Sequence, residues 1–387
     1  MARSLRVLLV ANDGLSAGHV MRAVAIGRGL ARAADRRGIA LATALATTSQ
    51  AHALLVRERL ALVTLPAPAV ARDAGLSDAE RRRLVRAAIG GVVDGFGPDL
   101  IVVDTFPSGP HGELAGLEHR ARRAVIRRSV PDARDEALAA GLADHDLAVL
   151  AGDPAPQRVE LPIPVRHVPP ITLVEAGGVV ERAAARAALA LPDGRAILVA
   201  AGGGGDAEAA GCARAIAEAI VRVAPEATAV LALGPLAAAP ASDASGPERA
   251  ARDARIRVVR TAPLAPLLAA FDGAFAPAGY NTAHELARAR VPAALFAQPR
   301  PFDDQAARAA RFAAAGFARV FAPAAAALAV DRVSHADVSL AVERGLDDAV
   351  AAALAWMAAA RVPELEAGGA DRAAEALLDL ATGGRGG

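Results

Sequence analysis

The stretch AGYNTAHE, residues 278–285, decides how this chain is interpreted. It follows an apolar run, residues 271–275, and begins a helical pattern that continues through Leu286. A glycine at a strand-to-helix turn lets the backbone approach a ligand closely, and the first turn of a helix offers N–H groups and partial positive charge to a phosphate. Glu285 lies too far into the helix to cap it, so its carboxylate can reach a neutral hydroxyl pair such as a ribose. The stretch predicts one half of a nucleotide-diphosphate site.

Length and composition limit the alternatives. The 387 residues predict roughly two to three domains. The net charge is +1, from 43 basic and 42 acidic residues, which gives no electrostatic case for a nucleic-acid partner. All the basic residues are arginine. The absence of lysine excludes a Schiff-base enzyme and a P-loop nucleotide site.

The cysteine content and hydropathy bear on location. Cys212 is the single cysteine, which excludes an intrachain disulfide and a cysteine-rich metal site and favours a reducing compartment. It lies in an alanine-rich helical pattern, where buried packing is expected. Neither a secretory signal nor a membrane-length apolar run is visible. We expect a soluble, cytoplasmic protein.

The order of elements predicts an α/β fold. Short apolar runs, typical of buried parallel strands, alternate with helical patterns in both halves of the chain. The predicted strands cover residues 5–10, 39–47, 62–65, 100–103, 124–127, 147–150, 196–200, 228–233, 256–259, 271–275 and 293–296. The alternation predicts two doubly wound, Rossmann-like parallel sheets.

A proline-rich segment separates the two halves. Prolines at this density do not suit a central strand or a helix interior. We therefore expect an N-terminal domain over 1–163, a linker over 164–170 and a C-terminal domain over 171–365. Residues 366–387 are expected to form a helix and tail that can return to the first domain.

Polar residues follow two predicted strands of the first half, where open α/β sheets bind ligands. The loop GLSAGHVMR, residues 14–22, places His19 at a helix start, and Asp104 ends a buried strand. A histidine here is compatible with a cap, or with a general base near neutral pH. Asp104 is a second candidate base.

Two further loops in the second half are rich in groups that bind anions and sugars. The loop GGGGD, residues 202–206, can wrap an anion with bare N–H groups, or can simply be flexible. The loop RPFDDQ, residues 300–305, can hydrogen-bond a sugar, and Asp303 or Asp304 can also cap the following helix.

Together these loops resemble those of nucleotide-sugar glycosyltransferases with the glycosyltransferase-B fold. The chain is similar to the branch containing the lipid-II-forming N-acetylglucosaminyltransferase, which has a C-terminal domain like that of glycosyltransferase family 28. The stretch 278–285 and the loop 302–305 stand in that family's order. The resemblance implies two Rossmann-like domains facing across a cleft. The N-terminal domain would lie on the acceptor side, and the C-terminal domain would bind the nucleotide-sugar donor.

The resemblance also implies a role for each matching residue. Catalysis falls to His19, with Asp104 as the alternative base. Diphosphate and donor contacts fall to Gly18, Gly203, Gly204, Gly279, Asn281 and Thr282. Glu285 would bind the ribose, and Asp304 and Gln305 would bind the donor sugar. The nucleobase would contact Arg260, Pro263 and Leu264. No cofactor and no metal are implied, because helix dipoles and loop N–H groups neutralise the leaving diphosphate.

The expected reaction is an inverting transfer from a nucleotide-diphosphate sugar, with uridine as the default base, to the hydroxyl of a small-molecule or lipid-linked acceptor. The first loop lacks the family's denser glycine run, which leaves the acceptor open. It also resembles a relative that hydrolyses a nucleotide-linked deoxysugar. A hydrolase, an epimerase and a non-catalytic nucleotide-sugar-binding protein remain alternatives. The basic run Arg81–Arg83 is compatible with a solvated helix face or with peripheral contact to an anionic membrane.

Overall fold

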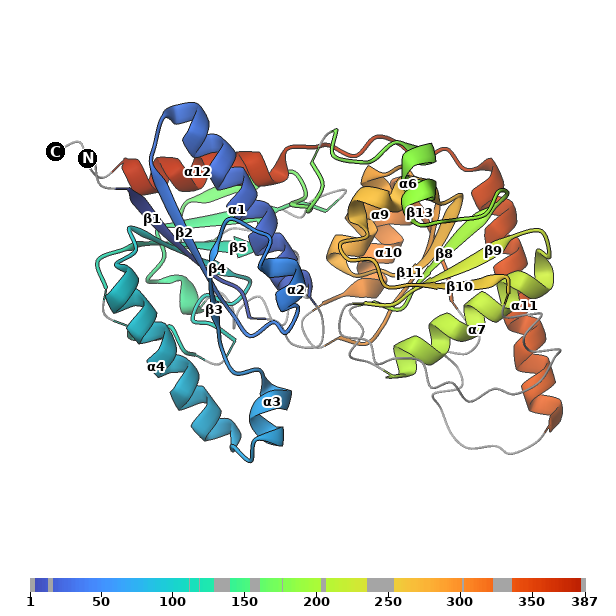
Figure 1. Ribbon diagram of the computed structural model, residues 1–387, viewed down its shortest axis with the longest axis horizontal. Coiled ribbons are helices and arrows are strands. Elements are labelled where there is room, and N and C mark those ends of the chain that lie inside the picture. The colour runs from blue at the N-terminus through green and yellow to red at the C-terminus, as the bar shows by residue number, and fades with distance from the viewer. Residues whose placement is uncertain are drawn as a thin grey trace. The chain divides into compact units, whose positions relative to one another are not determined.

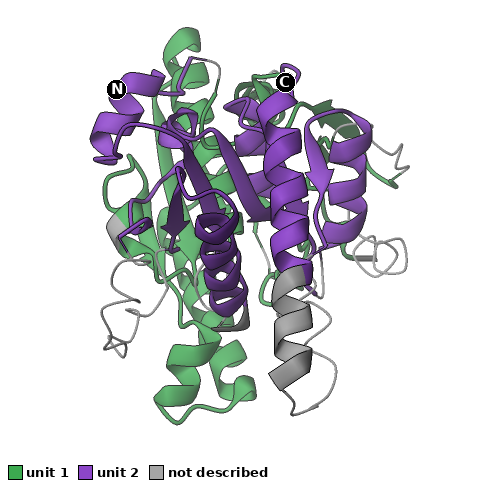
Figure 2. Ribbon diagram, turned by 90° about the vertical axis from the view of Figure 1, so that its right-hand side faces the viewer, with its two compact units in different colours: residues 1–175, 366–387 green, residues 176–365 purple. Residues whose placement is uncertain are grey.

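The chain forms two compact units in a computed structural model. The structure describes residues 4–12, 17–110, 112–117, 119–128, 140–153, 161–175, 177–202, 207–234, 254–300, 303–322 and 336–383. Unit 1 comprises Met1–Glu175 and Glu366–Gly387, and unit 2 comprises Ala176–Leu365 (Figure 2). The chain therefore passes from one unit to the other twice.

Unit 1 is built on a parallel sheet with the strand order β3-β2-β1-β4-β5-β6-β7 (Figure 1). The strands are β1 (Leu5–Val10), β2 (Leu41–Thr47), β3 (Ala61–Thr64), β4 (Leu100–Asp104), β5 (Arg122–Arg127), β6 (Leu147–Ala151) and β7 (Val165–Val168). The central strands are buried on both faces, which is why they read as continuous apolar runs. The direction of winding changes between β1 and β4, which is where such sheets bind ligands.

Helices cover both faces of this sheet. They are α1 (Gly18–Arg37), α2 (His52–Leu55), α3 (Pro68–Asp73), α4 (Asp78–Phe96), the 3₁₀ turn η1 (Ala140–Leu142) and α12 (Gly369–Thr382). Helix α4 begins with the capping box of Ser77 and Glu80 that the sequence predicts, and packs Val85 and Ile89 onto one face. On the other face, α12 lies against α1 (Figure 1).

The segment 164–170, predicted to be a linker, is part of unit 1. It contains β7, the edge strand of the sheet, which pairs with β6. Prolines are tolerated because they flank the strand and do not interrupt its ladder. The carbonyl of Pro164 accepts a hydrogen bond from Ala148.

Unit 2 is built on a second parallel sheet, with the order β10-β9-β8-β11-β12-β13. The strands are β8 (Ala196–Ala200), β9 (Thr228–Ala232), β10 (Ile256–Val259), β11 (Gly273–Pro277), β12 (Ala293–Phe296) and β13 (Ala318–Val320). Its winding changes direction between β8 and β11. These are the strands that precede the glycine loop and the stretch 278–285.

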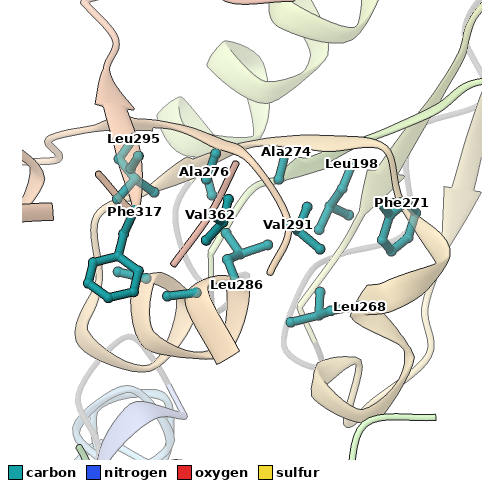
Figure 3. Close-up of a cluster of buried hydrophobic side chains, with 14 of the residues drawn as sticks. Leu198, Leu268, Phe271, Ala274, Ala276, Leu286, Val291, Leu295, Phe317 and Val362 are labelled. Atoms are coloured by element: carbon teal, nitrogen blue, oxygen red, sulfur yellow. The ribbon is translucent and has the colours of Figure 1, made fainter. Parts of the chain in front are cut away.

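The helices of unit 2 divide between the two faces of the sheet. They are α6 (Arg182–Ala188), α7 (Ala207–Val223), the 3₁₀ helix η2 (Ala265–Ala270), α9 (Tyr280–Arg288), α10 (Gln305–Ala314) and α11 (Ala336–Ala359). Alternate strand residues point to opposite faces. Leu198 and Ala276 therefore pack under α9 and α10 (Figure 3), whereas Val199 and Phe275 pack under α7 and α11.

No helix in the described ranges combines the length and the apolar character needed to cross a bilayer.

Candidate functional site

The first cluster lies at the carboxyl edge of the sheet in unit 1. His19 stands in the first turn of α1, and Asp104 is the last residue of β4. Imidazole Nδ1 of His19 hydrogen-bonds Oδ2 of Asp104. The fold thus joins the two residues that the sequence proposed as alternative bases into one hydrogen-bonded pair.

Arg22, which the sequence interpretation missed, fixes the Asp104 carboxylate. Its Nε donates to Oδ1 over 2.6 Å, and its Nη2 donates to Oδ2 over 2.6 Å. Two parallel hydrogen bonds from one guanidinium fix the orientation of a carboxylate more strictly than a single bond does. Both side chains are almost fully buried. Arg22 lies one turn after His19, so the helical spacing itself puts both residues on the face that meets β4.

The charges set the protonation of the pair. Burial lowers the pKa of His19 below its ordinary value, which outweighs the raising effect of the Asp104 carboxylate. Burial alone would raise the pKa of Asp104, but the charge of Arg22, with that of protonated His19, holds it well below its usual range. At neutral pH the cluster therefore contains an ionised Asp104 and a neutral His19. The hydrogen bond to Asp104 places the imidazole proton on Nδ1 and the lone pair on Nε2.

The backbone after β4 is strained where it meets this cluster. Thr105 has a φ of +66°, a left-handed conformation that is costly for a β-branched residue. The turn brings its hydroxyl within 3.1 Å of Arg22 Nη2 and carries Phe106 to a ring-centroid distance of 6.0 Å from His19. The strained turn thus places two residues that follow β4, Thr105 and Phe106, beside Arg22 and His19.

A second buried contact closes the same edge. The amide of Asn12, after β1, donates to the carboxylate of Glu113. Gly109 has a φ of +79°, and a side chain there would lie 2.4 Å from the Glu113 carboxyl carbon. Glu113 is therefore held against Asn12, just beyond the end of β1. Gly18 is the first residue of α1, and residues 13–16 of the preceding loop lie outside the described part of the chain.

The second cluster lies at the carboxyl edge of the sheet in unit 2, where α9 follows β11. On α9 itself, Tyr280 and His284 are buried, whereas Asn281, Thr282 and Glu285 are half-exposed. The stretch 278–285 therefore has one side that anchors it and one that can meet a ligand.

Gly279 is the residue before α9, with φ −63° and ψ 149°. Any residue adopts these angles. A Cβ at this position would meet no atom of the described residues within 4 Å. Neither the backbone angles nor packing among the described residues therefore requires a glycine at this position.

The glycine loop begins at Gly202, which has a φ of +84°. Gly203 and Gly204, predicted to bind diphosphate, lie outside the described residues.

The predicted sugar-binding pair is already engaged within unit 2. Asp304 is the N-cap of α10, and its Oδ1 accepts from Ala307 N over 2.9 Å. Gln305 is buried; its Oε1 accepts from Gln298 N over 3.0 Å, and its Nε2 donates to Asp303. The alternative that Asp304 caps the helix is confirmed. Its carboxylate retains further acceptor capacity, as carboxylates take about four hydrogen bonds.

The segment predicted to read the base follows β10, at the edge of the sheet. Arg260 and Pro263 are exposed, and Leu264 packs partly against the core under α9. These three residues therefore follow the carboxyl end of β10, whereas Gly202 follows β8 and Gly279 follows β11. In the parallel sheet β10 lies two strands from β8 and three from β11.

The fold was compared with solved structures. The kitacinnamycin glycosyltransferase matches with a TM-score of 0.59 and 16% identity, over 98% of this chain and 99% of its own. The spinosyn rhamnosyltransferase SpnG, complexed with thymidine diphosphate, matches with a TM-score of 0.54 and 17% identity, over 98% and 96%. MurG of Acinetobacter baumannii matches with a TM-score of 0.51 and 14% identity, over 97% of this chain and 100% of its own.

The chain has the glycosyltransferase-B fold. This confirms the predicted fold class of two Rossmann-like parallel-sheet domains. No family model matches the sequence, and no curated protein does. At identities of 14 to 17%, the likeness establishes the fold, and function rests on the two clusters.

Proposed function

We propose that the protein is an inverting glycosyltransferase that moves a sugar from a nucleoside-diphosphate sugar to an acceptor hydroxyl. The observation that carries this proposal is the hydrogen-bonded chain from buried Arg22 through buried Asp104 to half-buried His19. It supplies a neutral, oriented imidazole at the carboxyl edge of a Rossmann-like sheet. General bases of this kind are tuned by burial and neighbouring charge.

In the proposed step, Nε2 of His19 removes the proton of the acceptor hydroxyl. The acceptor oxygen forms a bond to the anomeric carbon while the bond from that carbon to the diphosphate oxygen breaks. The diphosphate leaves with the electron pair, and a single displacement inverts the anomeric centre. Asp104, ionised and held by Arg22, orients the imidazole and stabilises its protonated form. We therefore assign Asp104 as a positioning residue instead of an alternative base.

The donor is assigned to unit 2. The N-terminus of α9, with Gly279, Asn281 and Thr282, presents N–H groups to the diphosphate. Gly203 and Gly204 would add to them, and Gly18 is the residue of unit 1 that the resemblance assigns to the donor. These groups stabilise the leaving anion without a required metal ion, as the resemblance implies.

The other donor contacts follow the sequence prediction. Glu285, half-exposed on α9, accepts hydrogen bonds from the ribose. Arg260, Pro263 and Leu264 flank the base, and Asp304 and Gln305 contact the sugar. Uridine diphosphate is the default leaving group. The thymidine diphosphate bound by SpnG makes a thymidine-linked donor the first alternative.

The test is turnover with UDP- and TDP-linked hexoses and a panel of hydroxylic acceptors, read as released nucleoside diphosphate and as the anomeric configuration of the product by NMR. We expect acceptor-dependent release with inversion. A retained configuration would refute the single displacement, and nucleotide binding without turnover on any acceptor would favour a non-catalytic binding protein.

A hydrolase is the second candidate, because the same His19–Asp104 pair can activate water. Donor incubated without acceptor separates the two: stoichiometric free sugar at a rate that acceptors do not raise would assign hydrolysis.

A further inference from the structure

Arg308 is a fully buried arginine between two loops of the proposed donor site. It lies in the first turn of α10 and has no exposed surface. Its Nη1 donates to the Ala278 carbonyl over 2.9 Å and to Asp303 Oδ1 over 2.7 Å. One nitrogen therefore joins the turn after β11 to the segment before α10.

The same guanidinium faces an aromatic stack. Its carbon lies 5.7 Å from the ring centroid of Tyr280, within cation–π range. Tyr280 in turn packs on His284, with ring centroids 4.2 Å apart, and His284 Nδ1 donates to the Tyr280 carbonyl over 2.7 Å. The buried side of the stretch 278–285 is thus built around Arg308.

The contacts continue to the end of β12. The other oxygen of Asp303 accepts from Gln305 Nε2 over 3.3 Å, and Gln305 Oε1 accepts from Gln298 N. Arg300 Nη2 donates to the side chain of Gln298 over 3.0 Å. Both ends of the connection from β12 to α10 are therefore linked by one polar network to the turn that follows β11.

Stability alone gives a poor reason for this arrangement. Burying a charge is costly, and well-packed apolar residues often replace a buried ion pair without loss of stability. What an apolar residue cannot replace is the directional donation to Ala278 and Asp303 at once. The charge is retained where the geometry of two loops depends on it.

We propose that Arg308 is a positioning residue that fixes the segment 303–305 to the turn 278–280, so that the sugar-binding and diphosphate-binding groups keep one geometry. This inference rests on the proposed function for what the two loops bind. The connection that Arg308 makes between these two segments lies within unit 2, so it can be measured without any ligand.

The sequence offers a selective probe, because Tyr280 is the only tyrosine in the chain. Incorporation of 3-fluorotyrosine gives a single ¹⁹F resonance beside the Arg308 guanidinium. Hydrogen exchange of residues 298–300 and 303–307 reports on the segment before α10. We would compare the wild type with Arg308→Lys, Arg308→Met and Asp303→Asn, all ligand-free.

We expect Arg308→Met to broaden or split the ¹⁹F resonance and to speed exchange in these residues by about tenfold or more. Arg308→Lys, which keeps a cation, should recover part of the protection. Strand β8 should keep its wild-type exchange. Asp303→Asn carries the test if the Arg308 variants do not fold, because the Asp303 side chain is only partly buried and its substitution removes the ion pair while the Arg308–Ala278 hydrogen bond remains.

The matched control is Arg319→Gln, which removes an exposed arginine of β13 that donates to the Ala352 carbonyl in the same unit. It should leave both readouts unchanged. An unaltered ¹⁹F resonance and unaltered exchange in Arg308→Met and Asp303→Asn would overturn the proposal.

Donor binding separates this inference from the proposed function. If the wild type binds UDP or TDP by calorimetry, Asp303→Asn should weaken a nucleotide-sugar more than the bare diphosphate, because the sugar contacts depend on the segment 303–305. If the wild type binds neither nucleotide, the proposed function fails. The hydrogen-exchange data then decide by themselves whether Arg308 fixes the segment 303–305 to the turn 278–280.

Discussion

Nδ1 of His19 meets Oδ2 of Asp104 although the two residues are 85 positions apart in the sequence. The contact exists because β1 and β4 are adjacent and parallel, so the helix that follows β1 and the last residue of β4 arrive at one edge of the sheet. Arg22 then holds the carboxylate in a bidentate pair. This relationship generates the first two predictions.

Removing the imidazole should abolish most of the turnover. We expect His19→Ala to lower kcat by about 10²- to 10⁴-fold, the usual contribution of a general base, with little effect on donor binding. Asp104→Asn should also lower kcat, because the imidazole loses the carboxylate that orients it and stabilises its protonated form. His52→Ala, an exposed histidine of α2, is the control. Single-turnover rates with a nucleotide-sugar measure the effect, and a His19→Ala variant that transfers at the wild-type rate would remove His19 from the mechanism.

The pH dependence of turnover should reflect the opposite effects of Asp104 and Arg22 on the pKa of His19. A base works when neutral, so the acid limb of kcat/KM should lie below pH 6.5, because burial lowers the pKa of His19 from that value. Asp104 raises the pKa of His19 and Arg22 lowers it. The acid limb should therefore move down in Asp104→Asn and up in Arg22→Gln. Shifts in the same direction in both variants would contradict the arrangement of charges.

Gly279 should be needed for binding and not for folding. A Cβ there meets no described atom, so Gly279→Ala should lower the free energy of unfolding by only about 0.5–1 kcal/mol, the cost of alanine at a helix N-cap. Donor affinity should fall by about tenfold or more, because the added methyl group occupies the ligand's approach to the α9 N-terminus. Calorimetric titration with UDP and TDP measures it. Gly211→Ala on α7, which also meets no described atom, is the control.

Glu285 should act on the donor through the ribose. Losing a hydrogen bond to a charged group costs about 1.5–3 kcal/mol, so Glu285→Ala should weaken the donor by about 10- to 100-fold. The rate of a bound donor should change much less. Glu218→Ala, which removes an exposed carboxylate of α7, serves as the comparison. Unchanged donor affinity in Glu285→Ala would refute the assignment.

The packing of α12 on α1 should depend more on shape than on charge. Exposed ion pairs such as Arg32–Asp371 and Arg36–Glu375 contribute about 0–1 kcal/mol each. A side chain at Gly29 would lie 2.7 Å from the Ala370 carbonyl oxygen, and overpacking of that kind costs about 1–3 kcal/mol.

Gly29→Ala should therefore lower the melting temperature more than Arg36→Gln does. Gly91→Ala, on an open side of α4, should raise it slightly, because alanine is the better helix former. Equal melting temperatures for Gly29→Ala and the wild type would show that α12 can move away from α1 at no cost.

Most of the fold could be predicted from local patterns. The buried strands have continuous apolar runs, and the capping box of Ser77 and Glu80 marks the start of α4. The error at 164–170 came from proline, which marks an edge strand as readily as a linker. Composition cannot distinguish the two, because the difference lies in which side of the strand has a neighbour.

The site was predictable only where residues follow strands. His19, Asp104, Gly279 and Glu285 stand just after strands or in the helices that follow them, and the topological rule for α/β sheets finds them. Arg22 and Arg308 carry no such signal. Each looks like any arginine on a helix until the partner element is in place.

The sequence by itself determined the two Rossmann-like sheets, the ends of the strands that carry polar residues, and the resemblance to the glycosyltransferase-B fold. These follow from periodicity and spacing, which are local. Only the tertiary structure decided that His19 and Asp104 form one unit, that Asp104 is held ionised by Arg22, and that Arg308 joins two loops. Protonation and orientation depend on burial and on charges from distant parts of the chain, and those exist only once the strands are side by side.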